Sequence, residues 1–132
     1  MFCGDTLFSA GCGRMFEGTP TQMNDSLTKL RNLPPDTRMF CGHEYTAANL
    51  RFALTVDPAN DAAREYQGRV ERVRAQGKPT LPSTLDLEIQ VNPFLRCDNP
   101  AVVKAAEMHA GKSLGDTAEV FGVLRAWKDQ FR

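Results

Sequence analysis

The tripeptide Phe-Cys-Gly occurs twice in this chain, and each copy ends a short apolar run with a residue that can bind a metal ion. The first copy leads into Asp5 and the second into His43. A carboxylate and an imidazole are common ligands of Zn²⁺, Fe and Mn ions. Two ligands do not make a tight site, and the chain has only one other histidine, His109. The pattern therefore predicts a part of a metal site.

The apolar runs before Asp5 and His43 also constrain the fold. Residues 1–8 are typical of one strand, and residues 38–41 of a second, short strand, with a helical pattern between them. A strand, a helix and a strand in this order favour two parallel strands with a right-handed crossover. Ligands of such sheets gather beyond the carboxyl ends of the strands, where Asp5 and His43 both fall.

Helix signals fill most of the chain. The candidate capping residues are Thr21, Asn60 or Asp61, Asn99 and Asp116, and Thr46 is predicted to open a further helix. The helix after Thr21 should end before Pro34-Pro35, because proline cannot continue a helix. Residues 79–98 are richer in proline and β-branched residues, and they are predicted to run extended across the surface. The last helix should carry one apolar seam, formed by Val120, Leu124, Trp127 and Phe131.

Composition excludes several classes of protein. The 132 residues are enough for one domain with a core, and sixteen basic residues balance sixteen acidic ones. A strong field that would attract nucleic acid or a membrane surface is therefore not expected, and the apolar runs are too short to span a bilayer. Four cysteines without a secretory leader or a Cys-x-x-Cys pair favour reduced thiols in a cytoplasmic protein.

Six short motifs carry a resemblance to a known family. In chain order they are Gly4-Asp5-Thr6-Leu7-Phe8, Gly11-Cys12-Gly13-Arg14 with Glu17-Gly18, Cys41-Gly42-His43-Glu44-Tyr45-Thr46, Leu81-Pro82-Ser83-Thr84, Asn92-Pro93-Phe94-Leu95-Arg96 and Lys128-Asp129-Gln130-Phe131. With these motifs the chain resembles the carboxyl-terminal half of glyoxalase II, the hydroxyacylglutathione hydrolases of the metallo-β-lactamase superfamily. The resemblance covers nearly the whole chain, in the order and at the spacing of the family.

This resemblance implies an α/β part followed by a mainly α part. Residues 1–45 would be the terminal β-α-β portion of a metallo-β-lactamase-type catalytic domain, incomplete in this chain. Residues 46–132 would form a helical domain that binds glutathione. In the family, S-(2-hydroxyacyl)glutathione thioesters such as S-lactoylglutathione are hydrolysed to a hydroxy acid and glutathione. A hydroxide held by two divalent metal ions performs the attack.

The resemblance also implies roles for individual residues. Asp5 matches the aspartate that bridges the two metal ions, and His43 matches a histidine bound to one of them; both would be catalytic. The family accommodates Zn, Fe and Mn. Residues that match its glutathione-binding positions are Arg14, Phe16, Tyr45, Arg125 and Lys128, of which Phe16 stands where some members have a tyrosine. From the residues alone, Arg125 and Lys128 would ordinarily belong to a solvated helix face.

The remaining ligands of the family are absent from this chain. They belong to a Thr-His-x-His-x-Asp-His motif and a further histidine, which would lie in a missing amino-terminal half of the catalytic domain. We therefore expect the chain alone to bind metal weakly or not at all and to be inactive. The alternative is a non-catalytic helical module that binds glutathione and lacks the metal site. A nuclease or lactamase of the same superfamily is a third option, against which the motif Lys128–Phe131 argues.

Overall fold

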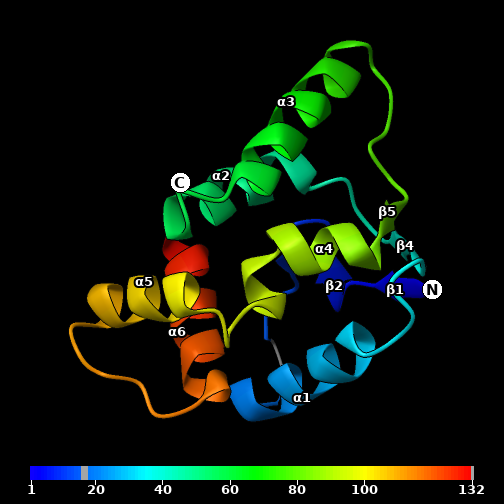
Figure 1. The fold of residues 1–132 in the computed structure, drawn as a ribbon. Helices are drawn as coiled ribbons and strands as arrows, with labels where there is room; N and C mark the ends of the chain where they lie inside the picture. Colours follow the sequence, from blue (N-terminus) through cyan, green and yellow to red (C-terminus); the bar gives the residue numbers. More distant parts are fainter. Residues whose placement is uncertain (16–17, 132) are drawn as a thin grey trace.

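Helices make up most of the computed structural model, which describes residues 1–15 and 18–131 (Figure 1). The strands are short: β1 (Phe2–Gly4), β2 (Leu7–Phe8), β3 (Gly11–Cys12), β4 (Arg38–Cys41) and β5 (Ser83–Thr84). The helices are α1 (Pro20–Arg31), α2 (Thr46–Val56), α3 (Asp61–Ala75), α4 (Leu85–Val91), the 3₁₀ turn η1 (Pro93–Leu95), α5 (Pro100–Ala110) and α6 (Thr117–Gln130). A mainly helical second part therefore follows a first part that holds most of the strands. None of the described helices is long and apolar enough to cross a membrane.

The strands form two small sheets. In the first, β1 pairs with β4 in parallel, which confirms the predicted parallel pair, and β5 pairs antiparallel with β4. In the second, β2 and β3 form an antiparallel hairpin. The prediction of one strand over residues 1–8 is wrong, because the chain turns at Asp5 and Thr6. There the amide of Thr6 donates to the carbonyl of Cys3 at 3.1 Å, which closes the turn and redirects the chain into the hairpin.

Helix starts follow local capping chemistry. The side chains of Asn60, Asn99 and Asp116 accept hydrogen bonds from the backbone of α3, α5 and α6, as predicted. Thr21 does not cap α1, because the helix begins one residue earlier, at Pro20, with Thr19 as its cap. Thr19 and Gln22 satisfy each other's backbone amides in a capping box, and proline suits the first helical position.

The segment 79–98 differs from its prediction. It forms α4 and η1 instead of an extended surface strand, and several of its apolar side chains are buried: Leu85, Val91, Phe94 and Leu95. The helix is only seven residues long, so its periodicity is weak in the sequence. Burial of these side chains, together with the cap that Thr84 supplies to the amide of Leu87, makes the helical form favourable.

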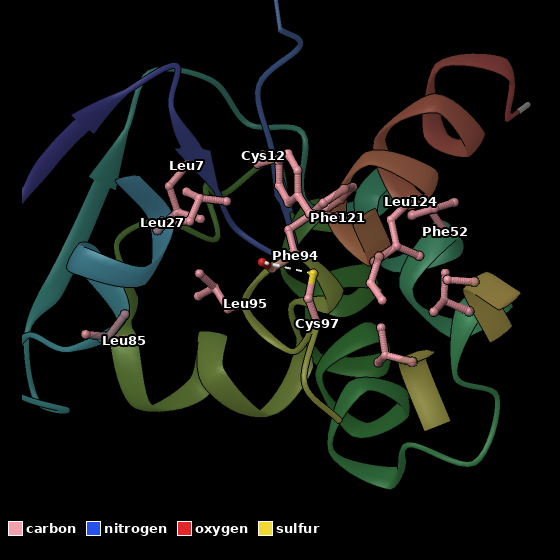
Figure 2. Close-up of a cluster of buried hydrophobic side chains, with 14 of the residues drawn as sticks. Leu7, Cys12, Leu27, Phe52, Leu85, Phe94, Leu95, Cys97, Phe121 and Leu124 are labelled. Carbon is pink, nitrogen blue, oxygen red and sulfur yellow. Dashed lines mark hydrogen bonds between the residues drawn. The ribbon is translucent and has the colours of Figure 1, made fainter. Parts of the chain in front are cut away.

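One apolar cluster joins the two ends of the chain (Figure 2). Leu7 of β2 and Leu27 of α1 are buried together with Phe52, Phe94 and Leu124 from the later helices. The predicted seam of α6 packs into this cluster, with Val120 and Leu124 fully buried and Trp127 and Phe131 partly buried against it. A smaller cluster lies between α2, α3 and the hairpin turn; it contains Ala10, Leu50, Ala63, Tyr66, Val70 and Val91. The first cluster thus joins residues before and after position 45 in one core.

Candidate functional site

A cleft of about 560 Å³ gathers six of the seven predicted site residues. They come from both ends of the chain: Asp5, Arg14, His43, Tyr45, Arg125 and Lys128. The seventh, Phe16, lies outside the described residues. The cleft is also lined by residues that were not predicted: Phe8, Cys12, Gly13, Ala48 and Asn49.

Asp5 and His43 lie at one end of this cleft. Because β1 and β4 are parallel, the loops after them emerge at the same edge of the sheet. The Nε2 atom of His43 is 3.4 Å from Oδ1 of Asp5, and both side chains are largely open to solvent. Two accessible ligands at this separation fit one part of a metal site. Within residues 1–15 and 18–131, no group of three or more His, Cys, Asp or Glu side chains is placed to hold a metal ion, either at this edge of the sheet or elsewhere.

Two glycines leave room for Asp5. A Cβ atom at Gly42 would lie 2.6 Å from Oδ1 of Asp5, and a Cβ atom at Gly13 would lie 1.9 Å from its carbonyl oxygen. At Gly13 the neighbouring atom belongs to the backbone, so a side chain does not fit there, whereas a side chain at Gly42 would require the Asp5 carboxylate to move. Glycine at the end of the second Phe-Cys-Gly copy therefore lets the Asp5 carboxylate keep its position, and glycine at position 13 lets the chain after β3 pass close to the backbone of Asp5.

Aromatic rings hold His43 in place. The imidazole stacks on Tyr45 with ring centroids 5.0 Å apart, and Phe8 meets Tyr45 edge-on at 5.0 Å. The segment itself is fixed by Glu44, whose carboxylate accepts hydrogen bonds from the hydroxyls of Thr46 and Thr80. Partial burial opposes ionisation of Glu44, but these hydrogen bonds outweigh it and lower the pKa of the carboxyl group. Both His43 and Tyr45 therefore sit on an ordered loop.

Basic side chains lie at the other end of the cleft. Arg125 donates from Nη1 to the carbonyls of Cys12 (2.7 Å) and Gly13 (3.3 Å), and from Nη2 to Oδ1 of Asp129 (2.9 Å). Only 5% of its side chain is exposed, so the solvated helix face expected from the residues alone is wrong for Arg125. The reason is its partners on β3, more than a hundred positions away in the chain, which make burial of the guanidinium favourable.

Arg14 and Lys128 complete the basic end. The Nε atom of Arg14 is 3.7 Å from the same Asp129 oxygen, and its side chain is 64% exposed. Lys128 is half-buried, and this burial together with the nearby cations Arg125 and Arg14 lowers the pKa of its ammonium group. Arg14 and Arg125 thus share the Asp129 carboxylate, and Lys128 adds a third cation beside them, which leaves this end of the cleft positive and suited to anionic groups.

Sequence reasoning did not single out several residues of the site. Asp129 could have been found from its position four residues after Arg125, which is the spacing of an ion pair on a helix. Phe8 and Asn49 gave no signal, because an apolar strand residue and a helix asparagine are common in many contexts. Cys12 lies at the cleft, but burial raises the pKa of its thiol to about 12, so it is not a thiolate there at neutral pH.

Comparison with known proteins decides the family. A family model described as "Hydroxyacylglutathione hydrolase C-terminus" matches residues 44–131. The chain belongs to the hydroxyacylglutathione hydrolase family. It is 57% identical to a hydroxyacylglutathione hydrolase of Cupriavidus taiwanensis over 132 residues, which is 100% of this chain and 49% of that protein. It is 55% identical to a hydroxyacylglutathione hydrolase of Pseudomonas paraeruginosa over 131 residues, which is 99% of this chain and 51% of that protein. It is 52% identical to a hydroxyacylglutathione hydrolase of Nitrosomonas europaea over 132 residues, which is 100% of this chain and 50% of that protein. The chain therefore spans about half the length of these hydroxyacylglutathione hydrolases.

Proposed function

We propose that this chain is the carboxyl-terminal half of an enzyme that hydrolyses S-(2-hydroxyacyl)glutathione thioesters, such as S-lactoylglutathione, to a hydroxy acid and glutathione. The observation that carries the proposal is the single cleft that has candidate metal ligands at one end and three cations at the other. Glutathione has two carboxylates and one ammonium group, so a site for it needs cations and hydrogen-bond donors beside the reacting thioester. The cleft has both.

Within this proposal the chain contains parts of two domains. Residues 1–45 belong to the end of a metallo-β-lactamase-type catalytic domain, and residues 46–132 form the helical domain that binds glutathione. The parallel pair of β1 and β4 and the helix α1 between them are compatible with the first assignment. The second is supported by the family match, which covers residues 44–131.

Asp5 and His43 would hold divalent ions such as Zn²⁺, Fe or Mn, together with ligands from the half of the relatives that this chain does not span. Such ions supply an activated water and stabilise negative charge on the thioester carbonyl oxygen. Among the chain's own groups, Tyr45 and Phe8 keep the imidazole of His43 turned toward Asp5. The exposure of both ligands leaves space for the thioester beside them.

The basic end would bind the peptide part of the substrate. Lys128 and Arg14 would receive its carboxylates, because both line the cleft and neither is fully buried. The hydroxyl of Tyr45 would donate a further hydrogen bond. Arg125 would act largely through the backbone, since its guanidinium already donates to the carbonyls that precede Arg14. Phe16 stays a predicted contact.

A second candidate function is a glutathione-binding module without catalysis. It is favoured by one observation: Asp5 and His43 are the two candidate ligands in the cleft, and the described part of the chain places no third ligand beside them. Both functions require glutathione to bind, and only the first requires Asp5 and His43 to act.

The two functions can be separated with a chimera that joins the amino-terminal half of the Cupriavidus taiwanensis relative to this chain. Hydrolysis of S-lactoylglutathione should be lost in the Asp5→Asn and His43→Ala variants. Lys128→Ala should raise KM with little change in kcat, and Lys112→Ala, an exposed lysine outside the cleft, should change neither. If this chain binds glutathione but the chimera is inactive with Zn²⁺, Fe²⁺ and Mn²⁺, the non-catalytic module is the correct function. If neither protein binds glutathione, both are refuted.

A further inference from the structure

One carboxylate outside the cleft is completely buried. Glu88 of α4 has no exposed surface, and its two oxygens accept four hydrogen bonds. Ser9 and Ser83 donate their hydroxyls to Oε2 at 2.8 and 2.7 Å, while the Ala10 amide and the Asn92 side chain donate to Oε1 at 2.7 and 3.2 Å. Burial of a carboxylate is unfavourable unless donors surround it. Four donors from three segments, the hairpin turn, β5 and the residue after α4, indicate that Glu88 is present for these contacts and does not merely fill space.

Two of these donors lie in the turn of the β2–β3 hairpin. Ala10 has a φ of 59°, in the left-handed region that residues with a side chain seldom adopt, so this turn needs external support. Asn92, which also contacts Glu88, donates to the carbonyls of Phe8 (3.2 Å) and Gly11 (2.9 Å) on the two strands of the hairpin. Glu88 in the middle of α4 and Asn92 just after this helix therefore hold both sides of the turn.

The hairpin continues directly into the cleft. Phe8 on β2 and Cys12 on β3 line it, Asp5 lies just before β2, and Arg14 lies just after β3. A displacement of the turn would thus be transmitted along two short strands to residues at both ends of the cleft. Glu88 itself does not belong to the described lining of the cleft.

We propose that Glu88 is a positioning residue: it ties the hairpin turn to α4 and so holds Asp5 and Arg14 in the geometry that the cleft needs. The inference rests on the proposed function for the identity of the ligand, glutathione. It extends that function by assigning a role in recognition to a buried group that touches no substrate.

The chain offers a matched pair of variants for the test. Ser9→Ala and Ser83→Ala each remove one buried hydroxyl that donates to the same Glu88 oxygen, but only Ser9 lies on the hairpin. Because Ser9 also bonds to the hydroxyl of Tyr66 at 2.8 Å, Tyr66→Phe serves as the control for that second contact. The measurements on the 132-residue chain are the Kd for glutathione, the melting temperature and the hydrogen exchange of the Gly13 amide, which donates to the carbonyl of Thr6 at 3.2 Å beside Arg14.

We expect Ser9→Ala to weaken glutathione binding by about fivefold, on the order of what one hydrogen bond contributes. Exchange of the Gly13 amide should become faster in this variant, because its bond to Thr6 lies at the cleft end of the hairpin. Ser83→Ala and Tyr66→Phe should change the Kd by less than about twofold, although their melting temperatures should fall by about as much as that of Ser9→Ala. Equal losses of affinity in Ser9→Ala and Ser83→Ala, or no loss in Ser9→Ala, would overturn the proposal, because a purely structural carboxylate would not distinguish the two serines.

Glu88→Gln tests the carboxylate itself. The amide keeps the volume and can accept from Ala10, while the two serine hydroxyls can turn to accept from its nitrogen, so the Kd should stay within about threefold of the wild type. A larger loss of affinity in a folded Glu88→Gln protein counts against the proposed geometry. If the wild-type chain does not bind glutathione, the proposed function fails, and the exchange of the Gly13 amide in the two serine variants decides the positioning role without a ligand.

Discussion

Arg125→Ala is expected to lower the free energy of unfolding by about 3 kcal/mol. The guanidinium is the hydrogen-bond donor to the carbonyls of Cys12 and Gly13, and both would lose it. Because water can reach them through the cleft, each loss should cost about 1 kcal/mol, the low end of the range for an unsatisfied buried group. The guanidinium also lies 5.3 Å from the centre of the Phe94 ring, and loss of this contact adds about 1 kcal/mol. Asp129 adds little, because its side chain is 41% exposed and can be hydrated.

Urea unfolding followed by tryptophan fluorescence measures this effect. Trp127 is the only tryptophan, and its ring contacts Phe52 (5.4 Å between centroids) and His109 (4.2 Å), so its emission should report loss of the core. For an m value of about 2 kcal/mol/M, the midpoint of Arg125→Ala should fall by about 1.5 M. Lys112→Ala, on an exposed loop, is the control. The reasoning is refuted if the two variants unfold within about 0.5 kcal/mol of each other.

Three further predictions concern single positions. Gly13→Ala should destabilise the fold by about 2 kcal/mol, because the Cβ atom of the new alanine would meet the carbonyl of Asp5. Gly68→Ala inside α3 should instead stabilise the fold by up to about 1 kcal/mol, because alanine favours a helix more than glycine does. Chemical denaturation of both variants measures the two changes in the free energy of unfolding. Cys12 should resist alkylation by iodoacetamide at pH 8 until the chain unfolds, and mass spectrometry of the native protein would detect a failure of this prediction. Burial raises the pKa of Glu88, so the folded state holds its proton more tightly than the unfolded state, and stability relative to Glu88→Gln should fall as the pH rises above about 4.3. A wild type that becomes more stable relative to Glu88→Gln as the pH rises would contradict the last prediction.

Local chemistry made the longer helices predictable. The caps Asn60, Asn99 and Asp116 act on amides two or three residues away, so a short stretch of sequence contains the whole interaction. The start of α1 was misplaced because Thr19 and Thr21 flank the same proline. The capping box between Thr19 and Gln22 decides between them.

Tertiary contacts limited the prediction elsewhere. The segment 85–95 has only seven residues of α-helix followed by a 3₁₀ turn, and its conformation depends on burial against distant elements. Burial of charged side chains likewise depends on distant elements. Arg125 is buried because β3 offers it carbonyls, and Glu88 is buried because the hairpin turn and β5 offer it donors. The spacing of residues within α4 or α6 does not indicate that Glu88 and Arg125 are buried.

The candidate site was predictable to the extent that motifs identify it. The six described residues named by resemblance all line one cleft, although the sequence separates Arg14 from Lys128 by most of the chain. Their roles stay predictions. What the motifs did not indicate is the support behind the cleft: the ion pairs of Asp129, the packing of Phe8 and the anchoring of the hairpin.

The core that joins Leu7 and Leu27 to Phe94 and Leu124 has a kinetic consequence. Rotation of residues 1–45 away from the later helices would expose this shared apolar surface to water, at a cost of several kcal/mol for each side chain pair separated. Hinge opening, which admits and releases ligands in many two-domain enzymes, is therefore opposed in this region. A ligand should enter and leave through the existing mouth of the cleft, and its dissociation rate should depend on motions of exposed rim side chains such as Arg14 and Tyr45.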